Sequence, residues 1–188
     1  LYTMSDTHAD RLKQLNKRYE ILDTIHLGDT AKLERLLGES KQEYQTKDRN
    51  LIITMAMKND NAIKMMPILV THFGMHWNSI MVEGARQGFL DIVKLAVEKG
   101  ADLWGIALCF AAKSEECSVT VLNFLLENGV LQIAHYEAAC CHAIERHRYS
   151  LAKTFIARGA KNWNAFLQSA AKVDSKEMIE LCLKNGAD

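Results

Sequence analysis

The sequence predicts an all-α fold, an α-solenoid of about six stacked helix-turn-helix repeats. Three observations predict it: an internal repeat, a 3.6-residue spacing of apolar residues inside each copy, and a glycine where each second helix must stop. The repeat is clearest in two segments that align without a gap, which read WNSIMVEGARQGFLDIVKLAVEKGAD at 77–102 and WNAFLQSAAKVDSKEMIELCLKNGAD at 163–188. Repeats of this length are typical of solenoids, in which each unit packs on its neighbours.

Each copy contains two short apolar blocks separated by a polar turn. In the copy at 77–102, a first helix is predicted around Ile80 and Ala85, a turn at Gly88, and a second helix after Leu90. Second helices are expected to end where a residue that tolerates a left-handed conformation follows them. That position is occupied by Gly100, Gly129, Gly159 and Gly186. No segment alternates with period two, so few or no strands are expected.

The predicted domain plan is an N-terminal capping helix over 1–18 and a repeat domain over 19–188, within one folding unit. The six repeats are expected at about 19–40, 49–74, 77–102, 104–129, 136–159 and 163–188, with a small insertion at 114–117. In the capping helix, Leu12, Leu15, Tyr19 and Leu22 share one side after N-cap candidates at 5–7. A helix that docks on a partner or lies on a membrane surface is the alternative for 1–18.

Small residues recur inside the predicted first helices and are expected to let neighbouring repeats approach closely. The pairs are Gly84-Ala85, Ala111-Ala112, Ala138-Ala139 and Ala170-Ala171. On this basis we expect Ala171→Leu to be destabilising.

Composition narrows the classes of partner. Lys and Arg number 23 and Asp and Glu number 23, so the net charge is +0 and no electrostatic excess favours nucleic acid or an acidic membrane. The five cysteines are odd in number and follow no disulfide spacing, and no secretory leader precedes them, which indicates a reducing cytoplasm. We therefore expect a cytoplasmic monomer with neither a nucleic-acid nor a membrane partner.

The run GARQGFLDIVKLAVEKGAD at 84–102 resembles the second two-thirds of an ankyrin repeat, whose family pattern reads A-A-x-x-G-H-L-E-I-V-K-L-L-L-E-x-G-A-D. Parts of this signature recur in the other copies, so the resemblance covers about 19–188. The family's Thr-Pro-Leu-His box is absent, however, and Trp77-Asn78 and Trp163-Asn164 stand in its place.

The resemblance implies repeats whose β-hairpin fingers are shortened or missing. The segment from Trp77 to Trp104 is shorter than the family repeat of about 33 residues, and the shortfall lies in the linker after Gly-Ala-Asp. Such copies resemble the divergent ankyrin repeats of large DNA viruses and of intracellular bacterial effectors. For a protein of either kind, the partner would be a host protein in the host cytoplasm.

The predicted function is that of an adaptor or scaffold that binds a protein through its concave first-helix face. In the ankyrin family, variable residues that follow the small pair often touch the partner. Here the candidates for partner binding are Arg86, Gln87, Lys113, Ser114, Glu145, Arg146, Lys172 and Val173. The alternative is that they are solvated charges. Arg86, Lys113, Arg146 and Lys172 would form a basic stripe, so an acidic partner surface is expected.

Two further functions remain as alternatives. The chain could be a regulatory or targeting domain of a larger enzyme, which a longer reading frame with a catalytic domain would reveal. RNA binding through the basic stripe conflicts with the zero net charge and with the lack of aromatic platforms on the same face.

No catalytic, cofactor-binding or metal-binding residue is predicted. The sequence contains no phosphate-binding, dinucleotide-binding, zinc-protease or nucleophile-elbow motif, so we expect no enzyme activity and no cofactor. Cysteines and histidines cluster at 135–147, but Cys140 and Cys141 are adjacent and His142 and His147 are five apart, which favours core packing over zinc. The aromatic residues that open the copies are interpreted as structural wedges, with binding hot spots as the alternative; they are Trp77, Trp104, Tyr136 and Trp163.

Overall fold

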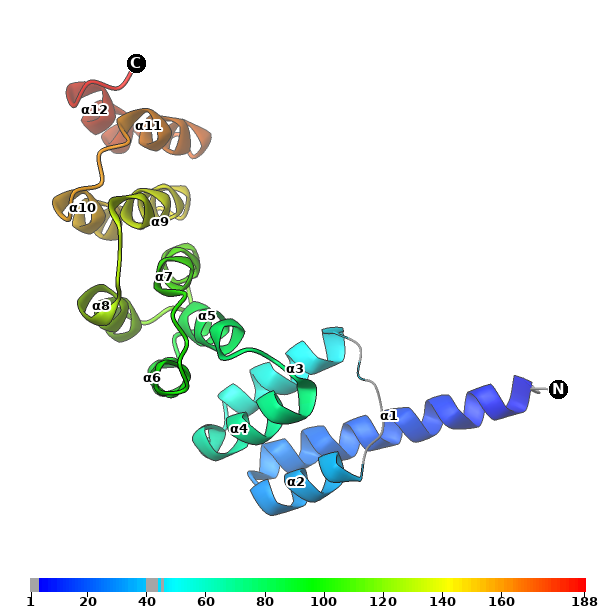
Figure 1. Cartoon of the computed structure of the whole chain (residues 1–188). Coiled ribbons are helices and arrows are strands. Elements are labelled where there is room, and N and C mark those ends of the chain that lie inside the picture. Colours follow the sequence, from blue (N-terminus) through cyan, green and yellow to red (C-terminus); the bar gives the residue numbers. More distant parts are fainter. Residues whose placement is uncertain (1–3, 40–43, 45) are drawn as a thin grey trace. The chain divides into compact units, whose positions relative to one another are not determined.

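A computed structural model describes residues 4–39, 44 and 46–188 of the chain, and within these residues it contains only helices (Figure 1). The twelve helices of this part are α1 Met4–Leu27, α2 Thr30–Gly38, α3 Thr46–Met57, α4 Ala62–Phe73, α5 Trp77–Gln87, α6 Leu90–Glu98, α7 Trp104–Lys113, α8 Val119–Asn128, α9 Ile133–Glu145, α10 Tyr149–Ala157, α11 Trp163–Lys172 and α12 Lys176–Lys184. The expected all-α fold is confirmed. The helices form two compact units, Leu1–His76 and Trp77–Asp188, where the sequence predicted one.

The first unit contains α1 to α4, with α1 packed on α2 and α3, and α4 packed on α2 and α3. Its core is made of aliphatic and methionine side chains with almost no exposure, among them Ile25, Leu33, Ile52, Met65 and Leu69. Asparagines in the turn between α3 and α4 hold the end of α1. The Asn59 Nδ2 donates to the carbonyl of Ile25 at 2.8 Å, and the Asn61 Nδ2 donates to that of Gly28 at 3.0 Å.

The predicted boundary between a capping helix and a first repeat at residue 18 is wrong, because α1 runs without interruption from Met4 to Leu27. No glycine or proline precedes Gly28, whose φ of 73° ends the helix. Among the α1 residues whose side chains the structure describes, Ile21 and Ile25 are fully buried in the core. The side chains of Leu12, Leu15 and Tyr19 are exposed, by 48%, 44% and 67%.

The second unit consists of four helix pairs in two layers (Figure 1). The first helices α5, α7, α9 and α11 each pack on the next, and we call them the first-helix row. The second helices α6, α8, α10 and α12 each pack on the first helix of their own pair. The pairs correspond to the predicted repeats at 77–102, 104–129, 136–159 and 163–188.

The small residues expected between neighbouring repeats are mostly buried, but the nearest atoms to a Cβ added to Gly84 belong to Ile92 and Val93 of its own second helix α6. One pair was also placed in the wrong register. Counted from the aromatic residue that opens each copy, the counterparts of Gly84-Ala85 and Ala111-Ala112 in α9 are Ala143 and Ile144, both buried, whereas Ala138 is exposed. A further close approach occurs between α7 and α9. A Cβ added to Gly105 would overlap the imidazole ring of His135, so only glycine fits there.

The ends of the first helices follow a common rule with one exception. A left-handed residue turns the chain after α5, α9 and α11, and it occupies the same repeat position each time. Its φ is 83° at Gly88, 56° at His147 and 50° at Asp174. Helix α7 has instead the insertion at 114–117, and Ser114 is extended. Its last carbonyl groups therefore need another donor.

The second helices end at the predicted glycines, although not always for the predicted reason. Gly100, Gly159 and Gly186 are left-handed, as the capping argument requires. Gly129 instead has φ −77° and ψ 141°, which any residue can adopt. A Cβ there would lie 2.5 Å from the carbonyl oxygen of Leu125 and 3.1 Å from Cε3 of Trp104, so glycine is required for space.

A side-chain clamp inside three of the four pairs explains the recurring Asn and Asp of the Trp-Asn and Gly-Ala-Asp motifs. The amide of Asn78 bonds Asp102 twice: its Oδ1 accepts from the backbone N–H at 2.8 Å, and its Nδ2 donates to the carboxylate at 3.1 Å. Asn164 bonds Asp188 in the same two ways, at 3.2 Å and 2.6 Å. In the pair of α9 and α10, Glu137 accepts from the backbone N–H of Lys161 at 3.2 Å. The start of α5, α9 and α11 thus holds the segment that leaves the second helix of the same pair, whereas α7 has Gly105 at this position.

The burial of the small-pair alanines in α7 and α11 changes one stability prediction. Ala112 has 0% exposure, and its counterpart Ala171 is exposed because α11 has a first helix on one side only. We therefore predict that Ala112→Leu lowers the free energy of unfolding by about 1–3 kcal/mol, because the added carbons have no room. Urea unfolding followed by circular dichroism measures the change.

Ala171→Leu is the matched control and is expected to stay within about 0.5 kcal/mol of the unchanged chain, as exposed substitutions do. This replaces the expectation that Ala171→Leu is destabilising. Equal destabilisation by the two substitutions would contradict the packing described for the row.

Candidate protein-binding surface

The eight residues predicted to bind a partner all lie at the C-terminal ends of the first-helix row. Each helix contributes two, from its last positions or the position directly after it: Arg86 and Gln87 on α5, Lys113 and Ser114 at α7, Glu145 and Arg146 at α9, and Lys172 and Val173 at α11. They occupy equivalent positions of the four repeats. Their side chains nevertheless have different surroundings.

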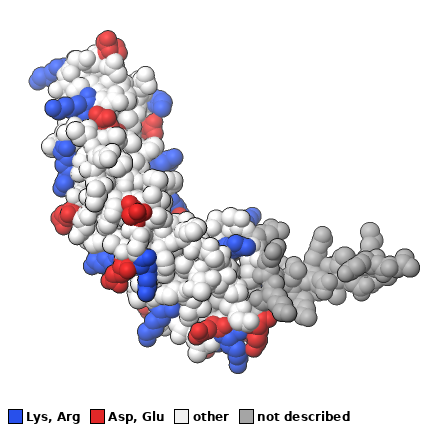
Figure 2. Space-filling view, viewed as in Figure 1, with Lys and Arg blue, Asp and Glu red and all other residues white. Residues whose placement is uncertain are grey.

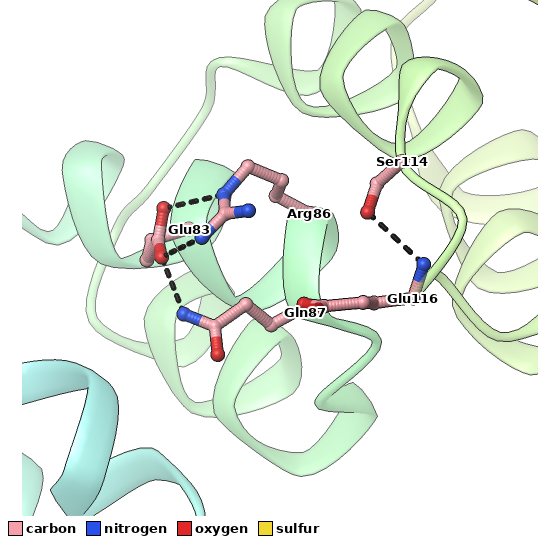
Figure 3. A network of polar contacts seen from close by, with 5 residues as sticks. All are labelled: Glu83, Arg86, Gln87, Ser114 and Glu116. Carbon is pink, nitrogen blue, oxygen red and sulfur yellow. Dashed lines mark hydrogen bonds and ion pairs between the residues drawn. The ribbon is translucent and has the colours of Figure 1, made fainter. Parts of the chain in front are cut away.

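On α5, the two candidates are engaged by a neighbouring carboxylate (Figure 3). The guanidinium of Arg86 donates to both oxygens of Glu83, at 3.0 Å and 2.6 Å, and the amide of Gln87 donates to one of them. The hydrogen bond from Arg86, together with that from Gln87, holds the pKa of the Glu83 carboxyl below its usual value against the effect of burial. Gln87 is 7% exposed, so its amide supports Glu83 and presents little surface to a partner.

On α9 and α11, two candidates pair with each other across the row. The Lys172 ammonium lies 3.0 Å from a carboxylate oxygen of Glu145. The hydrogen bond from Lys172 lowers the pKa of the Glu145 carboxyl, and His142 lies 3.6 Å from its other oxygen. The predicted basic stripe is thus interrupted by Glu145, and the charge of Lys172 is partly neutralised.

Lys113 and Arg146 keep their charges unpaired. Both are exposed, and neither has an ion pair with any residue that the structure describes. Figure 2 shows lysine and arginine side chains interspersed with acidic ones on the face of 77–188 turned toward the viewer. Of the four cations in the predicted stripe, these two are the ones available to a partner.

A hollow of about 460 Å³ brings four of the eight candidates together. We call it the α7 hollow; its lining residues are Arg86, Phe110, Lys113, Ser114, Glu115, Glu116 and Arg146. The remaining candidates Gln87, Glu145, Lys172 and Val173 do not line it. The hollow therefore lies between the ends of α5, α7 and α9.

Sequence reasoning missed Phe110, Glu115 and Glu116 in this hollow. A signal for Phe110 was present, because the equivalent positions of the other first helices carry Glu83, His142 and Ser169. A large apolar residue at a position otherwise polar marks an exception in the repeat. Glu115 and Glu116 belong to the insertion, which has no counterpart in the other copies and no register to align.

The wall of the hollow is held in place by a hydrogen bond inside the insertion and by contacts of the loop with the preceding repeat. The backbone N–H of Glu116 donates to the Oγ of Ser114 at 3.2 Å (Figure 3), and the Oγ of Ser118 donates to the carbonyl of Gly88 at 3.4 Å. A Cβ on Gly88 would lie 2.7 Å from the carbonyl oxygen of Glu116. The loop after α7 thus packs directly against the turn after α5.

Arg148 supplies the donor that the end of α7 lacks. Its Nη1 lies 2.8 Å from the carbonyl oxygen of Ala111, 3.2 Å from that of Ala112 and 2.7 Å from that of Ser114. A cation at this end also complements the helix dipole. One side chain from the next repeat therefore fixes both the end of α7 and the start of the loop beside the hollow.

Burial determines the protonation of two of the cysteine thiols. All five cysteines are free thiols. Burial raises the pKa of the Cys117 thiol to about 11 and that of Cys140 further, so both are protonated at neutral pH. Within the described residues, no three or more His, Cys, Asp or Glu side chains lie where they could hold a metal ion. Cys140 is fully buried, as the packing interpretation expected, whereas Cys141 is only partly buried.

The aromatic residues that open the repeats pack within their own pairs. The Trp104 ring lies 6.2 Å from that of Phe124 on α8, and the Tyr136 ring lies 6.5 Å from that of Phe155 on α10. Trp77, Trp104, Tyr136 and Trp163 are all partly buried. These contacts favour the structural interpretation of the aromatic positions.

Comparisons with protein-family models, curated proteins and solved structures found no match to this chain. Among the described helices, none has both the length and the hydrophobicity needed to cross a bilayer.

The capping role of Arg148 leads to a stability prediction. Arg148→Ala is expected to lower the free energy of unfolding by about 1–3 kcal/mol, because three carbonyl groups lose a charged donor. Thermal unfolding measured by circular dichroism tests this. Arg146→Ala removes the same charge from an exposed side chain two positions away and should change stability by less than about 0.5 kcal/mol. Equal effects of the two substitutions would refute the cap.

Proposed function

We propose that this chain is a non-enzymatic, cytoplasmic adaptor built from ankyrin-like repeats, and that it binds a protein partner through the C-terminal ends of the first-helix row. The observation that carries the proposal is the convergence of Arg86, Lys113, Ser114 and Arg146 on the α7 hollow. These residues come from three successive repeats and were selected by repeat position alone. A surface assembled in this way grows with each added repeat, which is the property that repeat proteins use for recognition.

The ankyrin-like assignment is supported by the architecture of the second unit. Its helix pairs stack through the first helices, and the Asn78–Asp102 clamp gives a physical role to the Trp-Asn and Gly-Ala-Asp motifs. The linker from Gly100 to Trp104 contains no strand. This agrees with repeats that lack the β-hairpin finger and leave partner binding to the helices.

The expected partner surface is acidic, but the charge that attracts it is more local than a stripe. Lys113 and Arg146 provide unpaired cations, whereas Arg86 and Lys172 are held by Glu83 and Glu145. An exposed charge pattern of this kind contributes to the rate and specificity of association more than to affinity, and its effect weakens with salt.

Affinity capture from cytosol with mass spectrometry tests the proposal, with the unchanged chain compared with Lys113→Glu/Arg146→Glu. This pair reverses the unpaired cations and breaks no ion pair of the described residues, whereas reversal of Arg86 or Lys172 would disrupt a salt bridge. The proposal predicts that a reproducible partner is captured by the unchanged chain and lost by the variant. Circular dichroism must show that the unchanged chain and the variant are equally helical, so that a lost partner does not reflect unfolding.

The matched control is Lys94→Glu/Lys184→Glu, which makes the same change in net charge on the exposed faces of the second helices α6 and α12. It should retain the partner. Loss of the partner with this control, and retention with the first variant, would place the interface on the second helices and contradict the proposal.

A further inference from the structure

Helix α7 differs from the other first helices in the face that it leaves uncovered. Leu103, directly before the helix, Ile106 and Phe110 are exposed by 37%, 47% and 44%. Their spacing of three and four residues places them on one side of the helix, over roughly 10 Å of its length. We call these three residues the apolar stripe.

The stripe lies on the open side of the first-helix row. Helix α7 packs on α5 and α9 at its flanks and on α8 behind it. The half-exposed side chains of the stripe therefore lie on the remaining face, opposite α8. The buried side of α7 is formed by other residues, among them Ala107, Leu108 and Ala111. The stripe is therefore not needed for the contacts that hold α7 in the row.

The same face is polar or small on the other first helices. At the position of Phe110 these helices carry Glu83, His142 and Ser169, and at the position of Ile106 they carry Ser79, Ala138 and Ala165. Single exposed apolar residues are ordinary on protein surfaces, but three on one face of one helix in a polar row are a local feature. An apolar centre with a polar surround is typical of the core and rim of a protein interface.

The stripe continues into the α7 hollow, because Phe110 lines it together with Lys113 and Arg146. Lys113 lies one turn beyond Phe110 on the same side of the helix. An occupant that covers the stripe therefore brings its next turn to two unpaired cations. Charge complementarity calls for a carboxylate at that point.

The loop after α7 restricts how many acidic groups can enter. Glu115 and Glu116 line the same hollow, and Glu116 lies close enough to the already paired Arg86 to contribute to the raised pKa of its guanidinium, after the hydrogen bond that Arg86 donates to Glu83. A run of acidic residues would meet these carboxylates and be repelled. One carboxylate directed at Lys113 and Arg146 would not.

We propose that the apolar stripe and the α7 hollow together bind a helical segment of a partner protein that carries bulky apolar residues one turn apart and a single carboxylate on the following turn. The inference rests on the proposed function and specifies its site and its partner's chemistry. Phe110 is the anchor, because it touches both the apolar stripe and the hollow. Ile106 extends the apolar contact, and Lys113 and Arg146 receive the carboxylate.

The experiment selects a phage-displayed library of random peptides on the full chain. The selected peptides should share paired apolar residues followed by one Asp or Glu. A synthetic peptide of the enriched sequence is then measured by fluorescence anisotropy. Its affinity should fall by about tenfold or more with Phe110→Ala, as for an interface hot spot, and by less with Ile106→Ala. Binding should weaken with Lys113→Glu, and the residual binding should depend less on salt.

Leu183→Ala is the matched control, because Leu183 is exposed by 54% on α12, outside the first-helix row, and should leave the affinity unchanged. Failure to enrich such peptides, or equal binding to Phe110→Ala, overturns the inference. If binding survives Phe110→Ala but is lost with Lys113→Glu/Arg146→Glu, the anchor is wrong and the proposed function stands. If peptide binding is lost only with Lys94→Glu/Lys184→Glu, the inference and the proposed function are both wrong. Self-association that Phe110→Ala abolishes, seen by sedimentation, would identify a second copy as the occupant and overturn the inference.

Discussion

The architecture of the second unit depends on how closely its first helices can approach. Each first helix carries small buried residues, such as Gly84, Ala111, Ala143 and Ala170, and Gly84 leaves room for Ile92 of its own second helix α6. A short helix pair cannot bury its apolar face alone, so each pair is stabilised by the next. At Gly105 the approach is so close that a methyl group would overlap His135. The position of every surface side chain on the row follows from this spacing, including those that surround the α7 hollow.

The insertion after α7 replaces the left-handed turn that follows the other first helices, and contacts with neighbouring repeats compensate for its loss. Without a left-handed residue at the end of the helix, the free carbonyl groups are bonded by Arg148 from the following repeat. The added loop then packs against Gly88 of the preceding repeat. The irregular segment is thus tied to both neighbours, and it forms part of the α7 hollow, where cations, carboxylates and an aromatic ring lie together.

Much of the fold could be predicted because its signals act within one repeat. Apolar spacing identified the helix pairs, and the recurring glycines marked the ends of the second helices. Two local signals were misjudged. Counting from Tyr136 would have shown that Ala138-Ala139 does not occupy the position of the small pair. The stretch before Gly28 contains no helix breaker, so no boundary at residue 18 was warranted. The pairing of Glu83 with Arg86 could also have been found, since the residues are three apart on a helix.

Other features depend on contacts between repeats and carry no local signal. Lys172 meets Glu145, and Arg148 meets Ala111, only because neighbouring pairs stack in a particular orientation. The sequence therefore identified eight positions by register, but it could not tell which cations would remain unpaired. The division into two units at His76 and Trp77 is likewise a property of packing, and no composition change marks it.

Native-state hydrogen exchange, resolved by mass spectrometry, tests most directly whether neighbouring pairs stabilise one another. Helices α7 and α9 have a first helix on both sides, whereas α11 has one neighbour in the row and α12 packs on α11. The account predicts that protection is greatest in α7 and α9 and decreases through α11 to α12, because opening a terminal pair breaks fewer contacts. Protection that is uniform across these helices, or greatest in α12, would contradict it.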